Sequence, residues 1–201
     1  MTKSLLALVL SVYAIVGGVR PAAVIDDEPN VPQERISIEI RRTAAGERIL
    51  AEEVWLEAPV EEVWNAYATA EGWMAWAAPA ARVDLRVGGE ILTAYPGVVL
   101  GEEGTNRLEI VNYVPREVLT LKADLRPNWP EVMRQDADRL SNVILFEPVS
   151  EDWTRLRAYG MGYGDSPEYE ALLGFFRKAN RGLYENLIKY LEEGAPVEWP
   201  E

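Results

Sequence analysis

The sequence predicts an α+β fold in which a curved antiparallel sheet of six or seven strands wraps around one long C-terminal helix. Three observations lead to this prediction. Short segments between residues 36 and 160 alternate apolar and polar side chains, as half-buried strands do. Two short helical segments interrupt this pattern between residues 59 and 76. The final segment, 165–194, has apolar residues at helical spacing along its length.

The first two strands are expected to form a hairpin. The segment ISIEI (36–40) alternates cleanly, and in ERILAEEVWLEA (47–58) the residues Leu50, Val54 and Leu56 share one face. The residues TAAGE between them are typical of a turn. One face of this hairpin should therefore be buried.

Two short helices are predicted next. Pro59 suits the first turn of a helix, and Glu61 and Glu62 are acids at the end where a helix favours them. A second helix is expected over residues 70–76. It should end before Pro79, because proline cannot continue a helix.

Strand-like alternation returns after these helices. In EVLTLKADL, Leu119, Leu121 and Ala123 face one way and polar residues face the other, which predicts an antiparallel sheet with one dry face. The segments expected to be strands here are RVDLRV (82–87), EILTAY (90–95), NRLEIVNYV (106–114), EVLTLKADL (117–125), SNVILFEPV (141–149) and TRLRAYG (154–160).

The longest helix is predicted at the C-terminal end of the domain. Asp165 or Ser166 can cap it, Pro167 suits its first turn, and Gly194 is typical of its end. This helix should lie on the dry face of the sheet. The space between sheet and helix can be filled by side chains or can stay open as an apolar cavity.

A signal peptide is predicted over residues 1–23. Lys3 precedes a largely apolar run over residues 5–16, and Gly17 and Gly18 follow. A membrane span needs about 20 apolar residues, so this run is short for one. Its length favours a cleaved signal over an uncleaved membrane anchor, and the cleavage position stays open. The chain is therefore expected to be exported, to the periplasm or outside the cell.

Three further units complete the expected organisation of the chain. Residues 24–35 are rich in proline and charge, which is typical of a flexible linker. Residues 36–194 form the folded domain, and residues 195–201 form a tail.

The composition excludes several kinds of function. The formal net charge of −13 disfavours a grip on nucleic acid or on an anionic membrane surface, since both need basic residues. Histidine and cysteine are absent, which excludes disulfides, zinc sites built on imidazole or thiolate, and nucleophile systems that use histidine. We expect no metal and no cofactor.

A family resemblance is carried by VWLEAPVEEVWNAYATAEGWMAWAAPAARVDLRVGGEI (54–91). This segment resembles the opening signature of the START-like (SRPBCC) superfamily, in the branch related to the C-terminal domain of the heat-shock-protein-90 ATPase activator. The matching pieces are Ala58-Pro59, Val63-Trp64, Trp76 to Pro79 and Asp84 to Gly89. Later segments match in kind and order, so the resemblance covers about residues 48–193.

This resemblance implies a helix-grip fold with a ligand cavity between the sheet and the C-terminal helix. It does not imply one activity, because the fold hosts lipid carriers, cyclases, hydratases and chaperone partners.

Seven residues are predicted to line that cavity. Tyr95 lies at the end of a strand, where its ring can stand at a rim, and Asn112 shares a face with Leu108 and Ile110 by alternation. Asn112 can instead be a backbone-satisfied amide at a strand end. The predicted lining residues are Trp73, Trp76, Tyr95, Asn112, Leu121, Phe146 and Phe176.

The tryptophans are expected to divide between core and cavity. Trp64 lies in the apolar face of the first helix and is predicted to be core. Trp76 lies just before Pro79, and core and cavity wall are equally consistent with its position. Trp73 is placed with Trp76.

We therefore expect an exported domain that binds a small hydrophobic molecule. The alternatives are a cyclase- or hydratase-type enzyme on the same cavity and a protein-interaction domain with a protein partner. Catalytic residues are unknown, because adjacent acids such as Glu52 and Glu53 point to opposite faces of a strand. No nucleic-acid partner is expected, and no membrane after signal removal. A buried carboxylate or tyrosine in a roomy cavity would favour the enzyme, and a filled cavity with an exposed apolar patch would favour protein interaction.

Overall fold

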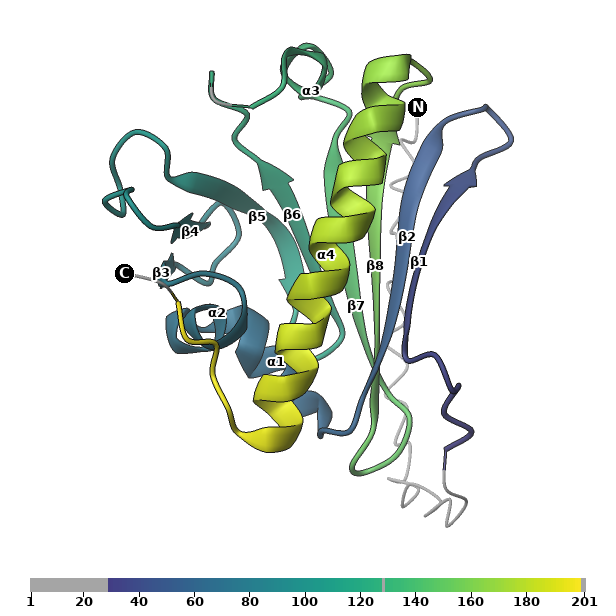
Figure 1. The fold of residues 1–201 in the computed structure, drawn as a ribbon, viewed down its shortest axis with the longest axis vertical. Helices are drawn as coiled ribbons and strands as arrows, with labels where there is room; N and C mark the ends of the chain where they lie inside the picture. The colour runs from purple at the N-terminus through teal and green to yellow at the C-terminus, as the bar shows by residue number, and fades with distance from the viewer. Residues whose placement is uncertain (1–28, 128, 200–201) are drawn as a thin grey trace, which may run out of the picture.

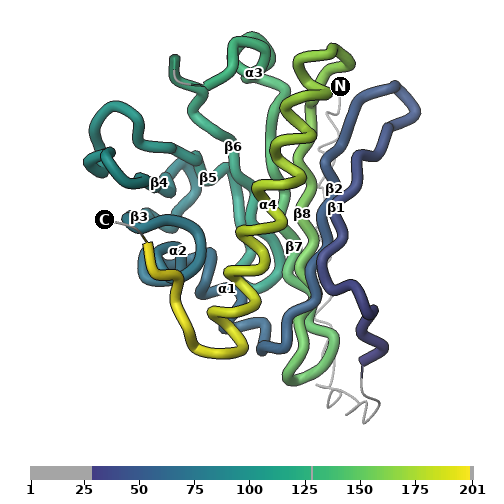
Figure 2. The backbone as a smooth tube through the Cα atoms, in the orientation of Figure 1, coloured from purple at the N-terminus to yellow at the C-terminus, as the bar shows by residue number. Residues whose placement is uncertain are grey.

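One antiparallel sheet curves around the long helix α4 (Pro167–Glu193), as Figures 1 and 2 show. The structure is a computed structural model that describes residues 29–127 and 129–199. Within these residues the sheet has eight strands in the order β1-β2-β8-β7-β6-β5-β4-β3. The strands are β1 (Ile36–Arg42), β2 (Arg48–Leu56), β3 (Ala80–Val83), β4 (Glu90–Ala94), β5 (Asn106–Val114), β6 (Val118–Ala123), β7 (Ser141–Pro148) and β8 (Thr154–Tyr163). The other helices are α1 (Val60–Ala68), α2 (Ala70–Trp76) and α3 (Glu131–Gln135).

The predicted α+β helix-grip fold is confirmed, with a wider sheet than expected. Neighbouring strands all pair antiparallel. The sheet exceeds the expected six or seven strands because a further strand pairs at each of its edges. Strand β1 pairs with β2 at one edge, and the short strand β3 pairs with β4 at the other.

Helix α4 has the termini that its sequence predicts. The Ser166 hydroxyl accepts a hydrogen bond from the backbone N–H of Tyr169 at 3.4 Å, and Pro167 occupies the first turn. Gly194 ends the helix with φ of 64°, in the left-handed region that glycine adopts most easily. Leu173 and Leu187 are buried in the core on the side of the helix that faces the sheet.

Helices α1 and α2 fill one end of the space between the sheet and α4, the lower end in Figure 1. Thr69 joins them and caps α2, since its hydroxyl accepts a hydrogen bond from the N–H of Gly72 at 2.9 Å. The two helices approach so closely that a Cβ at Gly72 would lie 2.4 Å from the carbonyl oxygen of Asn65. Glycine is therefore required at that position.

A β-bulge in β5 reverses its alternation. The register with β6 shifts between Ile110 and Asn112. Residues Leu108 and Ile110 face inward as predicted, but beyond the bulge Tyr113 packs against the core and Asn112 is exposed. The prediction that Asn112 faces the interior is wrong, because strict alternation assumes a strand without a bulge.

The segments that flank the domain make specific contacts where they are described. Arg35 forms an ion pair with Glu192 and lies over the ring of Trp153, 5.3 Å from its centroid. On the other side, the N–H of Val197 donates to the carbonyl of Ala75 at 2.8 Å, so residues 195–199 run back along α2. The tube in Figure 2 shows this return.

The predicted signal peptide, residues 1–23, and the first part of the predicted linker lie outside the described residues. Among the helices of the described ranges, none has the length and apolar character to cross a membrane.

Candidate ligand cavity

A cavity of about 280 Å³ lies between the sheet and α4, and no residue of α1 or α2 contributes to its lining. Strands β2, β4, β5, β6, β7 and β8 supply its floor, and α4 and the segment around α3 supply the rest of its wall. Its lining residues are Leu50, Glu52, Thr93, Tyr95, Asn106, Leu108, Leu121, Ala123, Trp129, Met133, Leu140, Ser141, Asn142, Gly160, Tyr163, Phe176, Asn180 and Leu183.

Three of the seven predicted residues lie in this lining. Leu121 and Phe176 are placed there by strand alternation and helical spacing, as expected. Tyr95 stands at the rim with 41% of its surface exposed, and its hydroxyl donates to the carbonyl of Ala77 at 3.0 Å. Its ring packs edge-to-face on Trp199, at 6.3 Å between centroids. Whether these three residues bind a ligand stays a prediction.

Trp73, Trp76 and Phe146 lie elsewhere, in the aromatic core that α1 and α2 form with the sheet. Trp76 is 3% exposed, and its indole N–H donates to the carbonyl of Ala66 at 3.0 Å. Trp73 donates to the carbonyl of Tyr67 at 2.7 Å and stacks on Trp76, at 5.5 Å between centroids. Phe146 packs edge-to-face on Tyr67 at 5.5 Å. None of the three lines the cavity, so Trp76 is core, one of the two roles consistent with the sequence.

The central polar residue of the cavity, Glu52, was not among the predicted site residues. It is 5% exposed and faces inward from β2. One carboxyl oxygen accepts a hydrogen bond from the Asn180 side-chain amide at 2.7 Å, and the other accepts from the Tyr184 hydroxyl at 2.5 Å. A signal was present in the sequence, because Glu52 has the same strand parity as Leu50 and Val54.

Burial controls the protonation of this group and its neighbours. Removal from water raises the pKa of Glu52, although the hydrogen bonds from Asn180 and Tyr184 act in the opposite direction. Burial, together with the charge of Glu52, raises the pKa of Tyr163 to about 12 and raises the pKa values of Tyr67 and Tyr184 well above the usual range. The tyrosine hydroxyls around Glu52 are therefore neutral at physiological pH.

The lining contains a second buried hydrogen-bond acceptor, and this one has no donor. The side-chain oxygen of Asn142, on β7, is buried and makes no hydrogen bond within the described residues. Buried polar atoms are nearly always paired, so an unpaired one in a cavity wall indicates a place for a donor from outside the chain. The site is thus a largely apolar cavity with aromatic rings in its lining, and its wall carries polar side chains that include the Glu52 carboxyl group and the unpaired Asn142 oxygen.

The described residues contain no group of three or more acids placed to hold a metal ion. The arrangement suits the recognition of an organic molecule by shape, apolar contact and a few hydrogen bonds.

Comparisons with known proteins agree with this architecture. A model of the family described as Activator of Hsp90 ATPase homolog 1-like protein matches residues 57–192, more than half of the chain. No curated protein matches the sequence.

Solved structures share the fold at low identity. CalU16 from Micromonospora echinospora is 20% identical over 81% of this chain and 85% of its own, with a TM-score of 0.55. The Aha1 dimer from Colwellia psychrerythraea is 17% identical over 73% of this chain and 97% of its own, with a TM-score of 0.56. DynU16, of the dynemicin biosynthetic locus, is 18% identical over 74% of this chain and 48% of its own, with a TM-score of 0.56.

Proposed function

The chain belongs to the Activator of Hsp90 ATPase homolog 1-like family, within the START-like (SRPBCC) superfamily, and we propose that it binds a small hydrophobic molecule in the cavity under α4. The observation that carries this proposal is the cavity itself, which has a volume of about 280 Å³. Ligand sites commonly measure roughly 300–1,000 Å³, so this cavity suits a compact molecule.

The distribution of side chains supports the same function. Leu50, Leu121 and Leu183 supply apolar walls from two strands and α4, and polar side chains such as Glu52 and Asn142 lie between them. Apolar walls with a few placed polar groups are typical of small-molecule sites. The large aromatic residues around Trp76 fill the other end of the space between the sheet and α4, and the cavity lies beyond them.

Fluorescence with N-phenyl-1-naphthylamine, a neutral apolar probe, tests the proposal. Its emission should rise and saturate at one probe per chain, and Ala123→Phe should abolish the rise because the new ring occupies the cavity. The matched control is Lys122→Phe, which adds the same ring to the outer face of β6 and should leave binding intact. No saturable rise in the folded parent, or equal binding by Ala123→Phe, would contradict the proposal.

An enzyme on the same cavity is the second candidate, and Glu52 is the observation that favours it. A buried carboxyl group with a raised pKa is suited to general acid or base catalysis. Native mass spectrometry of the chain purified from its own host separates the two candidates. An enzyme should retain a molecule of different mass in Glu52→Gln than in the parent, because substrate accumulates. Identical bound masses would support simple binding.

Export remains a proposal that rests on Lys3 and the apolar run over residues 5–16. The mature protein should lack at least the first 16 residues of the chain. Amino-terminal sequencing of the protein from its own host tests this, and an intact Met1 on cytoplasmic protein would overturn it.

A further inference from the structure

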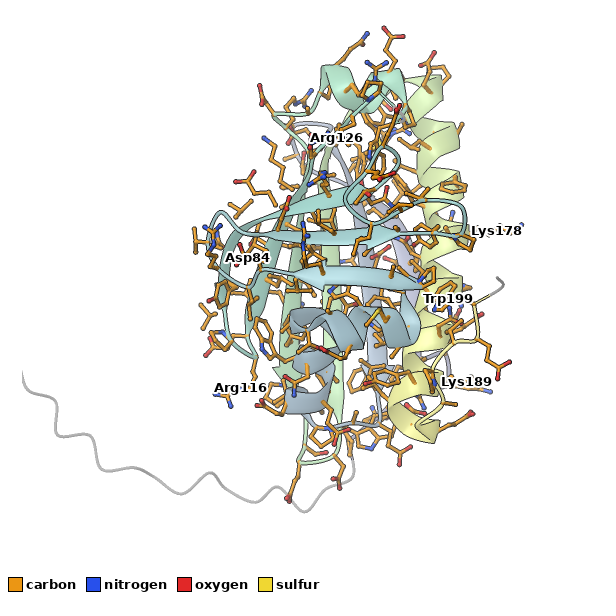
Figure 3. The ribbon with its side chains drawn as sticks, turned by 90° about the vertical axis from the view of Figure 1, so that its left-hand side faces the viewer. Asp84, Arg116, Arg126, Lys178, Lys189 and Trp199 are labelled. Carbon is orange, nitrogen blue, oxygen red and sulfur yellow. The ribbon has the colours of Figure 1, made fainter. Side chains whose placement is uncertain are left out.

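Glu52 is a buried acid without a cationic partner. The described arginines and lysines form many ion pairs, yet none of these pairs includes Glu52. Its polar neighbours are the neutral groups of Asn180 and Tyr184. Lys178, two residues before Asn180 on α4, is exposed and projects away from the sheet in Figure 3. A buried carboxylate ordinarily has a cationic partner. The charged form of Glu52 has no such partner among the described residues.

The cavity gives a partner access to this acid. Glu52 lines the cavity together with Asn180, and it is the one aspartate, glutamate, lysine or arginine among the described lining residues. Each carboxyl oxygen accepts one hydrogen bond from the protein, which leaves lone pairs for a further donor. The unpaired oxygen of Asn142 lies in the same lining and is also an acceptor.

Aromatic rings occupy other parts of the wall. Tyr95, Trp129, Tyr163 and Phe176 all line the cavity. The faces of such rings attract cations, most strongly where water is excluded. The lining therefore combines one acid, an unpaired acceptor and several rings, and it contributes no positive side chain within the described residues.

From these features we infer that the ligand is an apolar molecule with a protonated amine, which pairs with Glu52 while its apolar part fills the cavity. This inference rests on the proposed binding function. Amine binding favours the ionised carboxylate, and a Glu52 carboxyl that is protonated before binding releases its proton to solvent. In the absence of ligand, burial favours the neutral form of the carboxyl group, which is the direction of its raised pKa. Molecules with a carboxylate or phosphate head should bind more weakly, because their charge repels an ionised Glu52 and cannot pair with it.

Three probes of one shape test the inference by calorimetric titration: 1-naphthylmethylamine, 1-naphthylmethanol and 1-naphthoate. The amine should bind the parent protein at least about tenfold more tightly than the alcohol, and the carboxylate should bind most weakly. Glu52→Gln keeps the shape of the side chain but cannot ionise, so it should bring amine and alcohol to within about twofold of each other. The control Glu53→Gln, on the outer face of β2, should keep the preference.

The outcomes separate this inference from the proposed function. Equal binding of amine and alcohol by the parent, or an amine preference that survives Glu52→Gln, would overturn the inference and leave the binding function standing. No binding of any of the three probes, with no binding of N-phenyl-1-naphthylamine, would overturn both.

A measurement on the parent protein covers the case in which Glu52→Gln does not fold. The side-chain ¹³C carboxyl resonance of Glu52 should move towards that of an ionised carboxylate when 1-naphthylmethylamine is added at mildly acidic pH. An unchanged resonance at saturating amine would overturn the inference.

Discussion

The carboxyl group of Glu52 on β2 accepts a hydrogen bond of 2.5 Å from the hydroxyl of Tyr184 on α4. This contact joins the sheet to the helix at a point where the surrounding core is otherwise mostly apolar. Asn180, one turn earlier on the helix, donates to the same carboxyl group. The two donors hold the acid at the cavity wall and fix the direction in which its remaining lone pairs point.

The raised pKa of Glu52 has a consequence for stability. The folded state binds the proton of Glu52 more tightly than the unfolded chain does, so this contribution is fully present below the unfolded pKa and is lost as pH rises through the folded pKa. Tyr67, Tyr163 and Tyr184 surround the group and stay neutral over this range.

Glu52→Gln removes that titration. The free energy of unfolding of the parent, minus that of the variant, should therefore fall as pH rises above the ordinary glutamate pKa of about 4.3. Urea unfolding at a series of pH values measures the difference, with Glu53→Gln as the control for loss of an acid on the same strand. A difference that stays constant or grows with pH would contradict the raised pKa.

Asp165 should titrate in the opposite sense. Hydrogen bonds from the guanidinium groups of Arg42 and Arg48 lower its pKa to about 2. Its contribution to stability is present above the unfolded pKa and is lost as pH falls through the folded value. Arg42→Met should raise the pKa of Asp165 in a ¹³C NMR titration, whereas Arg41→Met, on the neighbouring residue, should not. An unchanged pKa in Arg42→Met would show that the ion pair does not form in solution.

Trp76→Ala should chiefly lower stability. The ring is buried, hydrogen-bonded and packed on Trp73, so its loss should cost about 3–5 kcal/mol of unfolding free energy, as at Trp64. Phe176→Ala, by contrast, removes a ring from the cavity lining and should weaken binding of N-phenyl-1-naphthylamine. Urea unfolding and the fluorescence titration measure the two effects. If Trp76→Ala keeps the stability of the parent but loses probe binding, the assignment of Trp76 to the core is wrong and the residue lines the cavity.

Two glycines in helices should respond to alanine with opposite signs. Gly174 is exposed in α4, and a Cβ there would meet no atom within 4 Å, so Gly174→Ala should stabilise the protein by about 0.5–1 kcal/mol. At Gly72 the Cβ would collide with the backbone of α1, and alanine should destabilise. Thermal unfolding of both variants tests the pair. A loss of stability in Gly174→Ala would contradict the open space around Gly174 on this face of α4.

Local signals were sufficient to predict much of the fold. The ends of α4 follow from Ser166, Pro167 and Gly194, each of which acts within one turn of its own position. Alternation placed Leu121 inward because β6 is regular over its length. The family resemblance supplied the arrangement of helix and sheet.

Long-range contacts account for what the sequence did not reveal. Asn112 turns outward because of a bulge whose position depends on pairing with β6. Trp73 and Trp76 are core because carbonyl groups near the end of α1 accept their N–H groups, a contact between helices that spacing does not show. Glu52 had inward parity, but its partners Asn180 and Tyr184 lie more than 120 residues away.

The most direct test of the central claim is a methyl NMR titration of the folded protein with N-phenyl-1-naphthylamine. A ligand in the cavity under α4 should shift the methyl resonances of Leu121 and Met133, which line it. The methyls of Leu56 and Leu187, equally buried but outside the lining, should shift little. Saturable shifts confined to the cavity lining are the predicted result. No shifts at Leu121 and Met133, or shifts only at exposed residues such as Val87, would contradict a ligand-binding cavity.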